Sequence, residues 1–232
     1  MDFIKEIEKL NINPNDNMLN QFQIYYQKLV EVNTYMNLTA ITDKEEVYNK
    51  HFLDSLSILN AIPFDMNFTL CDVGSGAGFP SIPLAIACNN VKVTIIDALN
   101  KRIRFLNDLI SDLKLDNAEA YHKRAEEYAK EKRETFDVVT ARAVARLNVL
   151  AELCMPLVRV NGLFVAMKGQ TGKEELDEAK RAIDTLGGKV INIIEFELPD
   201  DAGKREIIVI KKVKETPSKY PRAFAKIKER PL

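Results

Sequence analysis

The feature that most constrains the fold is a regular alternation of short apolar runs and helix-length segments after Pro63. Repeated strand–helix units predict a parallel sheet that helices cover on both faces. The predicted strands are Thr69–Val73, Val91–Ile96, Ala118–Tyr121, Phe136–Thr140 and Gly162–Met167. The predicted helices are Pro80–Cys88, Lys101–Leu115, Ala125–Lys132, Leu147–Val158 and Lys173–Leu186.

The end of the chain breaks this alternation. Lys189–Leu198 and Lys204–Val213 are β-type runs that the turn Pro199–Gly203 joins without a helix, which predicts an antiparallel hairpin. A dinucleotide-binding domain would instead place a helix before its sixth strand. We therefore expect a Rossmann-like α/β fold with the seven-stranded sheet of class I methyltransferases, in which five parallel strands are followed by a C-terminal antiparallel hairpin.

The first third of the chain predicts helices. Apolar residues recur at helical spacing from Met18 to Val32. Asp43, with Glu46 three residues later, is typical of a helix start, and an amphipathic pattern continues over Val47–Leu59. We expect a helical N-terminal extension over residues 1–63 and an α/β domain over residues 64–232.

Charge is divided unevenly along a chain whose formal net charge is −1. Met1–Asn60 carries nine acidic residues and five lysines, a net of −4, whereas Lys211–Leu232 carries eight basic and two acidic residues, a net of +6. This asymmetry favours either a tail that binds a polyanion or a solvated charged end. The sequence has no apolar run of about 18 residues, the length of a membrane span. Its three cysteines and two histidines predict buried, reduced thiols in a cytoplasmic protein without a metal site.

The strongest local motif is a glycine-rich loop between the first predicted strand and helix. Gly74, Gly76 and Gly78 let the backbone turn sharply and approach a ligand closely. Asp72 precedes the loop, and a carboxylate there would repel a pyrophosphate. It would attract a ligand with an ammonium group, such as the methionine part of S-adenosylmethionine.

The second predicted strand ends at another acid, Asp97. An acid at this position can accept hydrogen bonds from both ribose hydroxyls of a nucleoside. The alternative is a helix N-cap for Leu99–Leu115. Because Asp97 follows the glycine loop, we favour the ribose interpretation.

Several short motifs occur in order along the chain. They are Asn37–Ile41, His51–Ser55, Asp72–Pro80, Lys101–Arg102 with Phe105–Leu106, Arg124–Glu126, Ala141–Ala145 and Lys219–Arg222. Together they resemble the glucose-inhibited division protein B family of small-subunit rRNA (guanine-N7)-methyltransferases. The resemblance implies transfer of a methyl group from S-adenosylmethionine to N7 of one guanosine in 16S rRNA, as free rRNA or in a small-subunit particle. It implies no membrane and no obligate protein partner.

The resemblance also assigns residues. It places cofactor contacts on Gly74, Phe79, Ala125, Glu126 and Arg142, with Arg142 also near the target pocket, and the N-terminal extension over the cofactor and the RNA cleft. N7 of guanine carries a lone pair and no proton, so we expect no general base, and catalysis by proximity and alignment. The candidate RNA contacts are Arg146, Lys168, Lys219, Arg222 and Lys226.

Two alternatives to this function stay open at the level of sequence. One is a small-molecule methyltransferase on the same fold, and the other is a ribosome assembly factor that binds the cofactor with little turnover. A third idea, a hydrolytic triad of His51, Asp54 and Ser55, is disfavoured because side chains so placed on one helix cannot align for that chemistry. We expect local hydrogen bonds beside the cofactor cleft instead.

Overall fold

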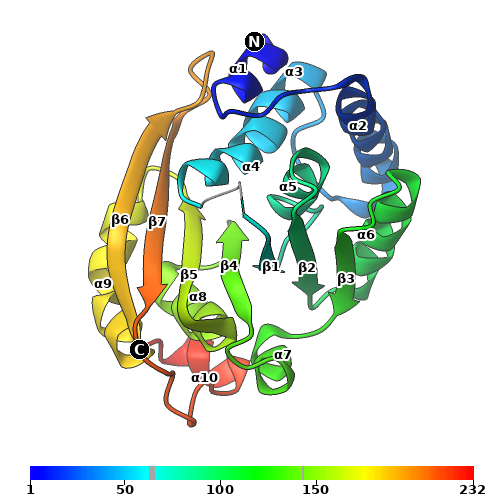
Figure 1. Ribbon diagram of the computed structural model, residues 1–232. Helices are drawn as coiled ribbons and strands as arrows, with labels where there is room; N and C mark the ends of the chain where they lie inside the picture. Colours follow the sequence, from blue (N-terminus) through cyan, green and yellow to red (C-terminus); the bar gives the residue numbers. More distant parts are fainter. Residues whose placement is uncertain (63–65, 143) are drawn as a thin grey trace.

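The computed structural model describes residues 1–62, 66–142 and 144–232, and in them the chain forms one seven-stranded sheet (Figure 1). Its strand order is β3-β2-β1-β4-β5-β7-β6. The strands β1 to β5 pair in parallel, and β7 pairs antiparallel with both β5 and β6. This topology confirms the predicted fold class. The strands are β1 Phe68–Val73, β2 Val91–Asp97, β3 Ala118–His122, β4 Phe136–Arg142, β5 Val158–Lys168, β6 Gly188–Glu197 and β7 Lys204–Lys212.

Helices cover both faces of the sheet and enclose two apolar clusters. One cluster joins α1 to α6 to one face, and the other joins α7 to α10 to the opposite face. The helix α2 lies against α5 and α6, and α9 lies beside β6 and β7 (Figure 1). The helices are α1 Phe3–Glu8, α2 Asp16–Met36, α3 Lys44–Val47, α4 Asp54–Leu56, α5 Ser81–Ala87, α6 Asn100–Asp112, α7 Ala125–Glu131, α8 Leu147–Cys154, α9 Gly172–Thr185 and α10 Phe224–Glu229.

Two predicted helices differ from those observed. The segment predicted as a helix to Val158 ends as α8 at Cys154, and Met155–Leu157 forms a 3-10 turn before β5 begins at Val158. Pro156 explains this end, because it lacks an amide hydrogen and its ring disfavours continuation of the helix. The amphipathic pattern over Val47–Leu59 is divided as well, since α3 and α4 flank a π-helical segment at Tyr48–Leu53 and a 3-10 turn follows.

The N-terminal helices share a core with the sheet. Phe22, Tyr25 and Phe52 are fully buried and belong to the same cluster as Leu70 of β1 and Val165 of β5. The predicted boundary between residues 63 and 64 lies outside the described residues. None of the described helices is long and apolar enough to cross a membrane.

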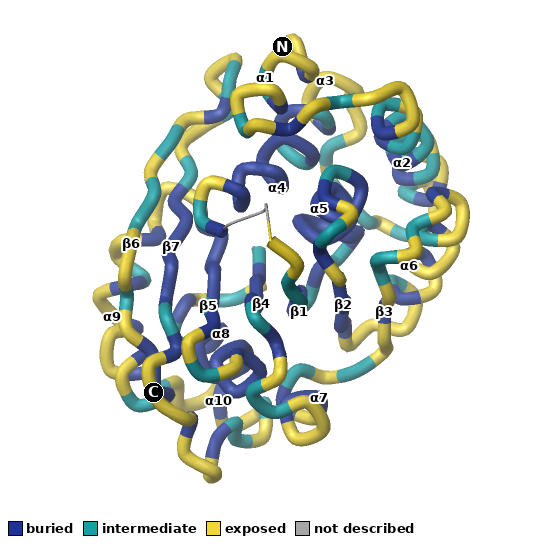
Figure 2. The backbone as a smooth tube through the Cα atoms, viewed as in Figure 1, coloured by how far each residue is buried: buried dark blue, intermediate teal, exposed yellow. Residues whose placement is uncertain are grey.

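Burial distinguishes the two hairpin strands. Figure 2 shows β7 buried over most of its length and β6 largely accessible at the edge of the sheet. Side chains of β7 alternate between the two apolar clusters, with Ile207 and Val209 in one and Ile208 and Ile210 in the other, which explains this continuous apolar run.

Candidate functional site

The glycine loop runs from the end of β1 at Val73 to the start of α5 at Ser81. Gly74, Gly76 and Gly78 all have positive φ angles, of 75°, 64° and 105°, which other residues rarely adopt. A Cβ on Gly78 would lie 2.7 Å from Ile82, whereas a Cβ on Gly76 would meet no heavy atom of the described residues within 4 Å. The backbone at Gly76 therefore faces open space where a ligand can approach.

Asp72 is fully buried beside this loop. Neither of its carboxylate oxygens has a hydrogen-bond partner among the described residues. Burial raises the pKa of this carboxyl to about 7, because the ionised group loses its hydration, and the nearby Ser81 and Arg142 offset only part of that effect. The Ser75 hydroxyl is likewise buried and unpartnered in the part of the chain that the structure describes. These groups are suited to a ligand that brings a cation and hydrogen-bond donors.

Asp97, at the end of β2, faces the same loop. Its carboxylate accepts hydrogen bonds from the Gly76 amide at 3.3 Å and the Leu99 amide at 2.8 Å. It also pairs with the Arg102 guanidinium at 3.2 Å. The helix α6 begins at Asn100, so the N-cap position is Leu99 and not Asp97. Asp97, the last residue of β2, therefore stabilises both the glycine loop and the turn before α6.

Ala125 and Glu126 begin α7, after β3. The Glu126 side chain is 11% exposed and accepts a 2.6 Å hydrogen bond from Arg124 Nε. Phe79 lies at the other end of the glycine loop and is 5% exposed. Its ring stacks on His51 at 4.5 Å and on Tyr25 at 5.4 Å, so its side chain is committed to packing.

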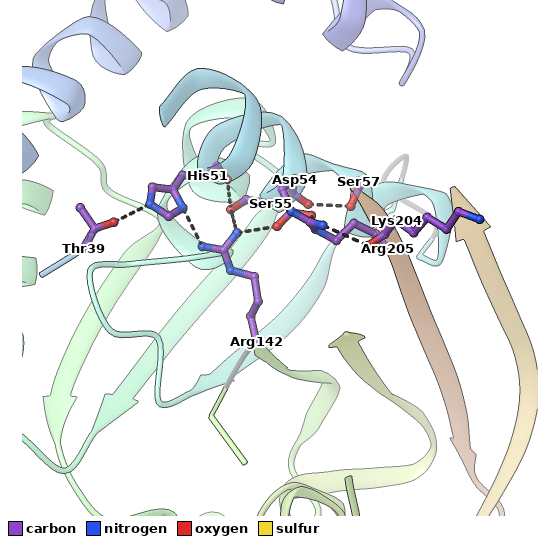
Figure 3. A network of polar contacts seen from close by, with 8 residues as sticks. All are labelled: Thr39, His51, Asp54, Ser55, Ser57, Arg142, Lys204 and Arg205. Carbon is purple, nitrogen blue, oxygen red and sulfur yellow. Dashed lines mark hydrogen bonds and ion pairs between the residues drawn. The ribbon is translucent and has the colours of Figure 1, made fainter. Parts of the chain in front are cut away.

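Arg142, at the end of β4, joins three parts of the chain (Figure 3). Its guanidinium donates to Asp54 Oδ2 at 3.0 Å and to His51 Nδ1 at 3.4 Å, and lies 4.8 Å from the centre of the Phe79 ring. Asp54 also accepts a 3.0 Å hydrogen bond from Arg205 Nε of β7. Asp54 thus bridges two arginines from different strands, which compensates the burial of its charge.

The hydrogen bond from Arg142 determines which ring nitrogen of His51 carries the proton. A guanidinium only donates hydrogen bonds, so Nδ1 accepts and the proton of the neutral ring lies on Nε2, which donates to Thr39 Oγ1 at 2.7 Å. Burial, and secondarily Arg142, lowers the pKa of His51 to about 4. The Ser55 hydroxyl donates to the His51 backbone carbonyl and not to its ring. The geometry agrees with the expected local hydrogen bonds and excludes a hydrolytic triad.

A cavity of about 560 Å³ opens beside Arg142, beyond the carboxyl ends of β4 and β5. Ligands of open α/β sheets bind at this edge. Its wall includes the network residues His51, Asp54, Arg142 and Arg205, and also Val144, which is the side chain nearest to Gly74. The cavity therefore adjoins the glycine loop.

Two candidate RNA contacts line the cavity but already have partners. The Lys168 side chain is 6% exposed, and its ammonium binds Glu175 at 2.7 Å and the Ala145 carbonyl at 2.7 Å. Arg146 pairs with Glu178 on the surface. Because the Lys168 ammonium is buried within these contacts, it does not present a free charge to phosphate.

Several residues of the predicted basic tail are held against the rest of the protein by hydrogen bonds and ion pairs. Lys212 is fully buried and pairs with Glu134 at 3.0 Å. The Arg222 guanidinium binds the buried Glu152 through both carboxylate oxygens. Lys219 and Lys226 are exposed. The net charge of +6 thus overstates the charge that this end presents to a polyanion.

Three residues of this site were missed by the sequence analysis. Tyr25 donates to a carbonyl of the glycine loop, Thr39 accepts from His51, and Arg205 holds Asp54. Thr39 belongs to one of the motifs quoted above, and that motif was the available signal. Tyr25 looks like an ordinary core residue of α2, and Arg205 follows a turn, so neither has a distinguishing sequence pattern.

Comparison with known proteins decides the family. The model of the family "rRNA small subunit methyltransferase G" matches residues 18–208. The chain belongs to this family. It is 54% identical over 219 residues to the ribosomal RNA small subunit methyltransferase G of Staphylococcus saprophyticus, covering 94% of this chain and 92% of that one. With the protein of the same name from Lactobacillus johnsonii it shares 51% identity over 234 residues, 99% of this chain and 98% of that one.

Solved structures support the fold. A SAM-dependent methyltransferase from Aquifex aeolicus matches with a TM-score of 0.54 at 16% identity, over 72% of this chain and 93% of that one. The fibrillarin pre-rRNA processing protein of Methanococcus jannaschii matches with a TM-score of 0.52 at 18% identity, over 66% and 70% of the two chains. The family member described here is a methyltransferase with a Rossmann-like α/β fold.

Proposed function

We propose that the protein transfers the methyl group of S-adenosylmethionine to N7 of a guanosine in 16S rRNA, as free rRNA or in a small-subunit particle. The observation that carries this proposal is the buried Asp72 carboxylate, which lacks hydrogen-bond partners among the described residues and precedes an accessible glycine loop. Membership of the methyltransferase family and the names of the curated relatives support the choice of RNA.

The residues around the loop fit S-adenosylmethionine. Asp72 would pair with the ammonium of the methionine part, which relieves the cost of burying an ionised carboxylate. Asp97 would accept from the ribose hydroxyls at the end of the neighbouring strand. Ala125 and Glu126, at the start of α7, would contact the adenosine, and Gly76 leaves room for the backbone approach.

The cavity beside Arg142 would receive the target guanine. When bound, S-adenosylmethionine supplies an electrophilic methyl group on its sulfonium. N7 carries a lone pair and no proton, so the protein needs to hold and align the base and not to remove a proton. His51 and Arg142 form one wall of the cavity, where burial keeps the imidazole neutral and the bond from Arg142 orients it.

Gly76→Ala is expected to weaken binding of both S-adenosylmethionine and its demethylated product by about tenfold, because a Cβ would point into the space of the ligand. Its φ of 64° also strains alanine, by about 1 kcal/mol. Isothermal titration measures the affinity, and thermal unfolding measures the strain. An affinity equal to that of the parent protein would place the cofactor elsewhere.

The exposed lysines of the tail are expected to provide RNA affinity without chemistry. The double variant Lys219→Glu/Lys226→Glu should raise the KM for RNA and lower its salt dependence by about one to two units of slope, because phosphate contacts release counterions. Cofactor affinity should stay unchanged. The matched control is Lys92→Glu, an exposed lysine near the amino end of β2, the edge of the sheet away from the site. The control makes half the charge change of the double variant, so an effect half as large in the control would show that only net charge matters.

The proposal is tested with small subunits and deproteinised 16S rRNA from a strain that lacks the gene. Each substrate, and separately a mixture of free nucleosides, is incubated with purified protein and methyl-labelled S-adenosylmethionine, and the modified nucleotide is mapped. Label on one guanosine at N7 would support the proposal. Label on free nucleosides but not on rRNA would favour a small-molecule methyltransferase, and cofactor binding without turnover would favour an assembly factor.

A further inference from the structure

The helix α2 reaches the glycine loop through one residue, Tyr25. Its ring is fully buried, and its hydroxyl donates a 2.7 Å hydrogen bond to the backbone carbonyl of Ala77. Ala77 lies within the loop, between Gly76 and Gly78, and 52 positions from Tyr25 along the chain. A neutral hydrogen bond in a buried setting is directional, so it fixes where this carbonyl points.

The same side chain also limits the space at the next loop residue, Gly78. The Tyr25 hydroxyl would lie 2.9 Å from a Cβ on Gly78, so the loop backbone passes against it at contact distance. The Tyr25 ring stacks on Phe79 with 5.4 Å between ring centres and on Phe52 with 5.0 Å. Three consecutive residues of the loop therefore contact Tyr25.

We propose that Tyr25 is a positioning residue for the cofactor, because it holds the Ala77–Phe79 part of the loop in the conformation that turns Gly76 toward the ligand. This inference rests on the proposed function. The N-terminal helical segment then supports the glycine loop through this hydrogen bond and does not itself contact the substrate. The loop is then preorganised, and the ligand does not have to order it on binding.

The chain offers a matched control on the same helix. Tyr26 follows Tyr25, and its hydroxyl also donates to a backbone carbonyl, that of Thr42 at 3.2 Å. Tyr25→Phe and Tyr26→Phe thus remove the same atom and the same kind of hydrogen bond. They differ in the segment that is released, which is the glycine loop in one case and the connection before α3 in the other, and in burial, since the Tyr25 bond is buried and the Tyr26 bond is exposed. Thermal unfolding of both variants therefore accompanies the binding measurements.

The test compares these two variants with the parent protein. Tyr25→Phe should raise the Kd and the KM for S-adenosylmethionine by about tenfold, which equals the loss of one hydrogen bond of about 1.4 kcal/mol. Its kcat at saturating cofactor and its KM for RNA should stay unchanged. Hydrogen exchange should be faster at the amides of Gly78 and Phe79, while the amides of α2 keep their protection. Tyr26→Phe should leave all of these values at the parent level.

Equal cofactor affinity in Tyr25→Phe and Tyr26→Phe would overturn the inference. A loss of kcat and of RNA affinity that parallels the loss of cofactor affinity would also overturn it, because it would indicate general destabilisation. Binding of S-adenosylmethionine to the parent protein distinguishes failure of the proposed function from failure of this inference. If it does not bind S-adenosylmethionine, the proposed function fails; if it binds and only the Tyr25 effect is absent, the proposed function stands and this inference alone fails.

Discussion

Asp72→Asn is expected to lower the affinity for S-adenosylmethionine by more than a hundredfold and to stabilise the cofactor-free protein. The carboxylate is fully buried and has no hydrogen-bond partner among the described residues. Removing one partner of a buried ion pair costs about 3–5 kcal/mol. Without the cofactor the desolvation cost of this charge exceeds the stabilisation by Ser81 and Arg142, so its neutral isostere should raise the free energy of unfolding at pH 8 by about 1–3 kcal/mol.

The pH dependence of both quantities follows from the same group. The folded protein raises the pKa of Asp72 to about 7, above its ordinary value of 3.8. The folded state therefore holds this proton more tightly than the unfolded state, and the contribution of Asp72 to stability falls as pH rises from about 4 to 7. His51, whose pKa is lowered to about 4, has the opposite effect below its ordinary pKa, so the difference in stability between the parent protein and Asp72→Asn isolates the contribution of Asp72. The ionised carboxylate binds the ammonium, so cofactor affinity should rise from pH 6 to 8 while the ammonium keeps its proton. Asp72→Asn should remove this rise in affinity.

Asp137→Asn is the control for this experiment. Asp137 lies near the amino end of β4 and accepts hydrogen bonds from Thr69 and Arg159, which lowers its pKa in spite of its partial burial. A lowered pKa contributes stability above the unfolded value that is lost as pH falls. This variant should lose stability at pH 8 and keep its cofactor affinity. Calorimetric titration and thermal unfolding at pH 6, 7 and 8 measure all of these effects, and unchanged affinity in Asp72→Asn would contradict the assignment of the ammonium site.

Arg222→Ala is expected to destabilise the fold by about 3 kcal/mol, a structural effect at a residue that the sequence analysis named as an RNA contact. Its guanidinium makes hydrogen bonds of 2.8 and 3.1 Å to the two oxygens of Glu152, and its backbone amide adds one of 2.9 Å. The Glu152 side chain is 0% exposed. Truncation of the arginine leaves a buried charge without its partner, which is the costly change at such a pair.

A double variant distinguishes structure from RNA binding. Glu152→Gln/Arg222→Met removes both charges and should recover most of the lost stability, as replacement of buried ion pairs by neutral groups commonly does. If Arg222 serves the fold alone, the double variant keeps the parent KM for RNA. Chemical denaturation and methylation kinetics below the unfolding temperature measure the two properties. A raised KM in the stable double variant would show that Arg222 also contacts RNA.

The succession of strands and helices, with its final hairpin, and the position of the glycine loop could be predicted from sequence because their signals are local. Apolar runs of strand length, the missing helix before the last strand and the closely spaced glycines each lie within a few residues. Asp72 and Asp97 end adjacent parallel strands, whose paired register includes Asp72 with Ile95. Parallel pairing brings such residues to one edge of the sheet without further information.

The state of the charged residues could not be predicted in this way. Arg222 looks like a surface charge in the sequence, but its partner Glu152 lies on α8, 70 positions away. Lys168, at the end of β5, binds Glu175 in the first turn of α9, the next element along the chain. Whether a basic residue is free for phosphate depends on which acid the fold places beside it. For Arg222 sequence spacing does not contain that distance, because the two segments meet only after the helices pack.

By itself, the sequence predicted the fold class, the position of the glycine loop and two acids at neighbouring strand ends, since each depends on residue type and short spacing. Only the tertiary structure decided how the edge is completed. It brought Asp54 to Arg142 over 88 positions and to Arg205 over 151, and Tyr25 to Ala77 over 52. These contacts join segments whose approach is driven by burial of a shared apolar core, and that non-directional force leaves no local pattern at the polar residues it brings together.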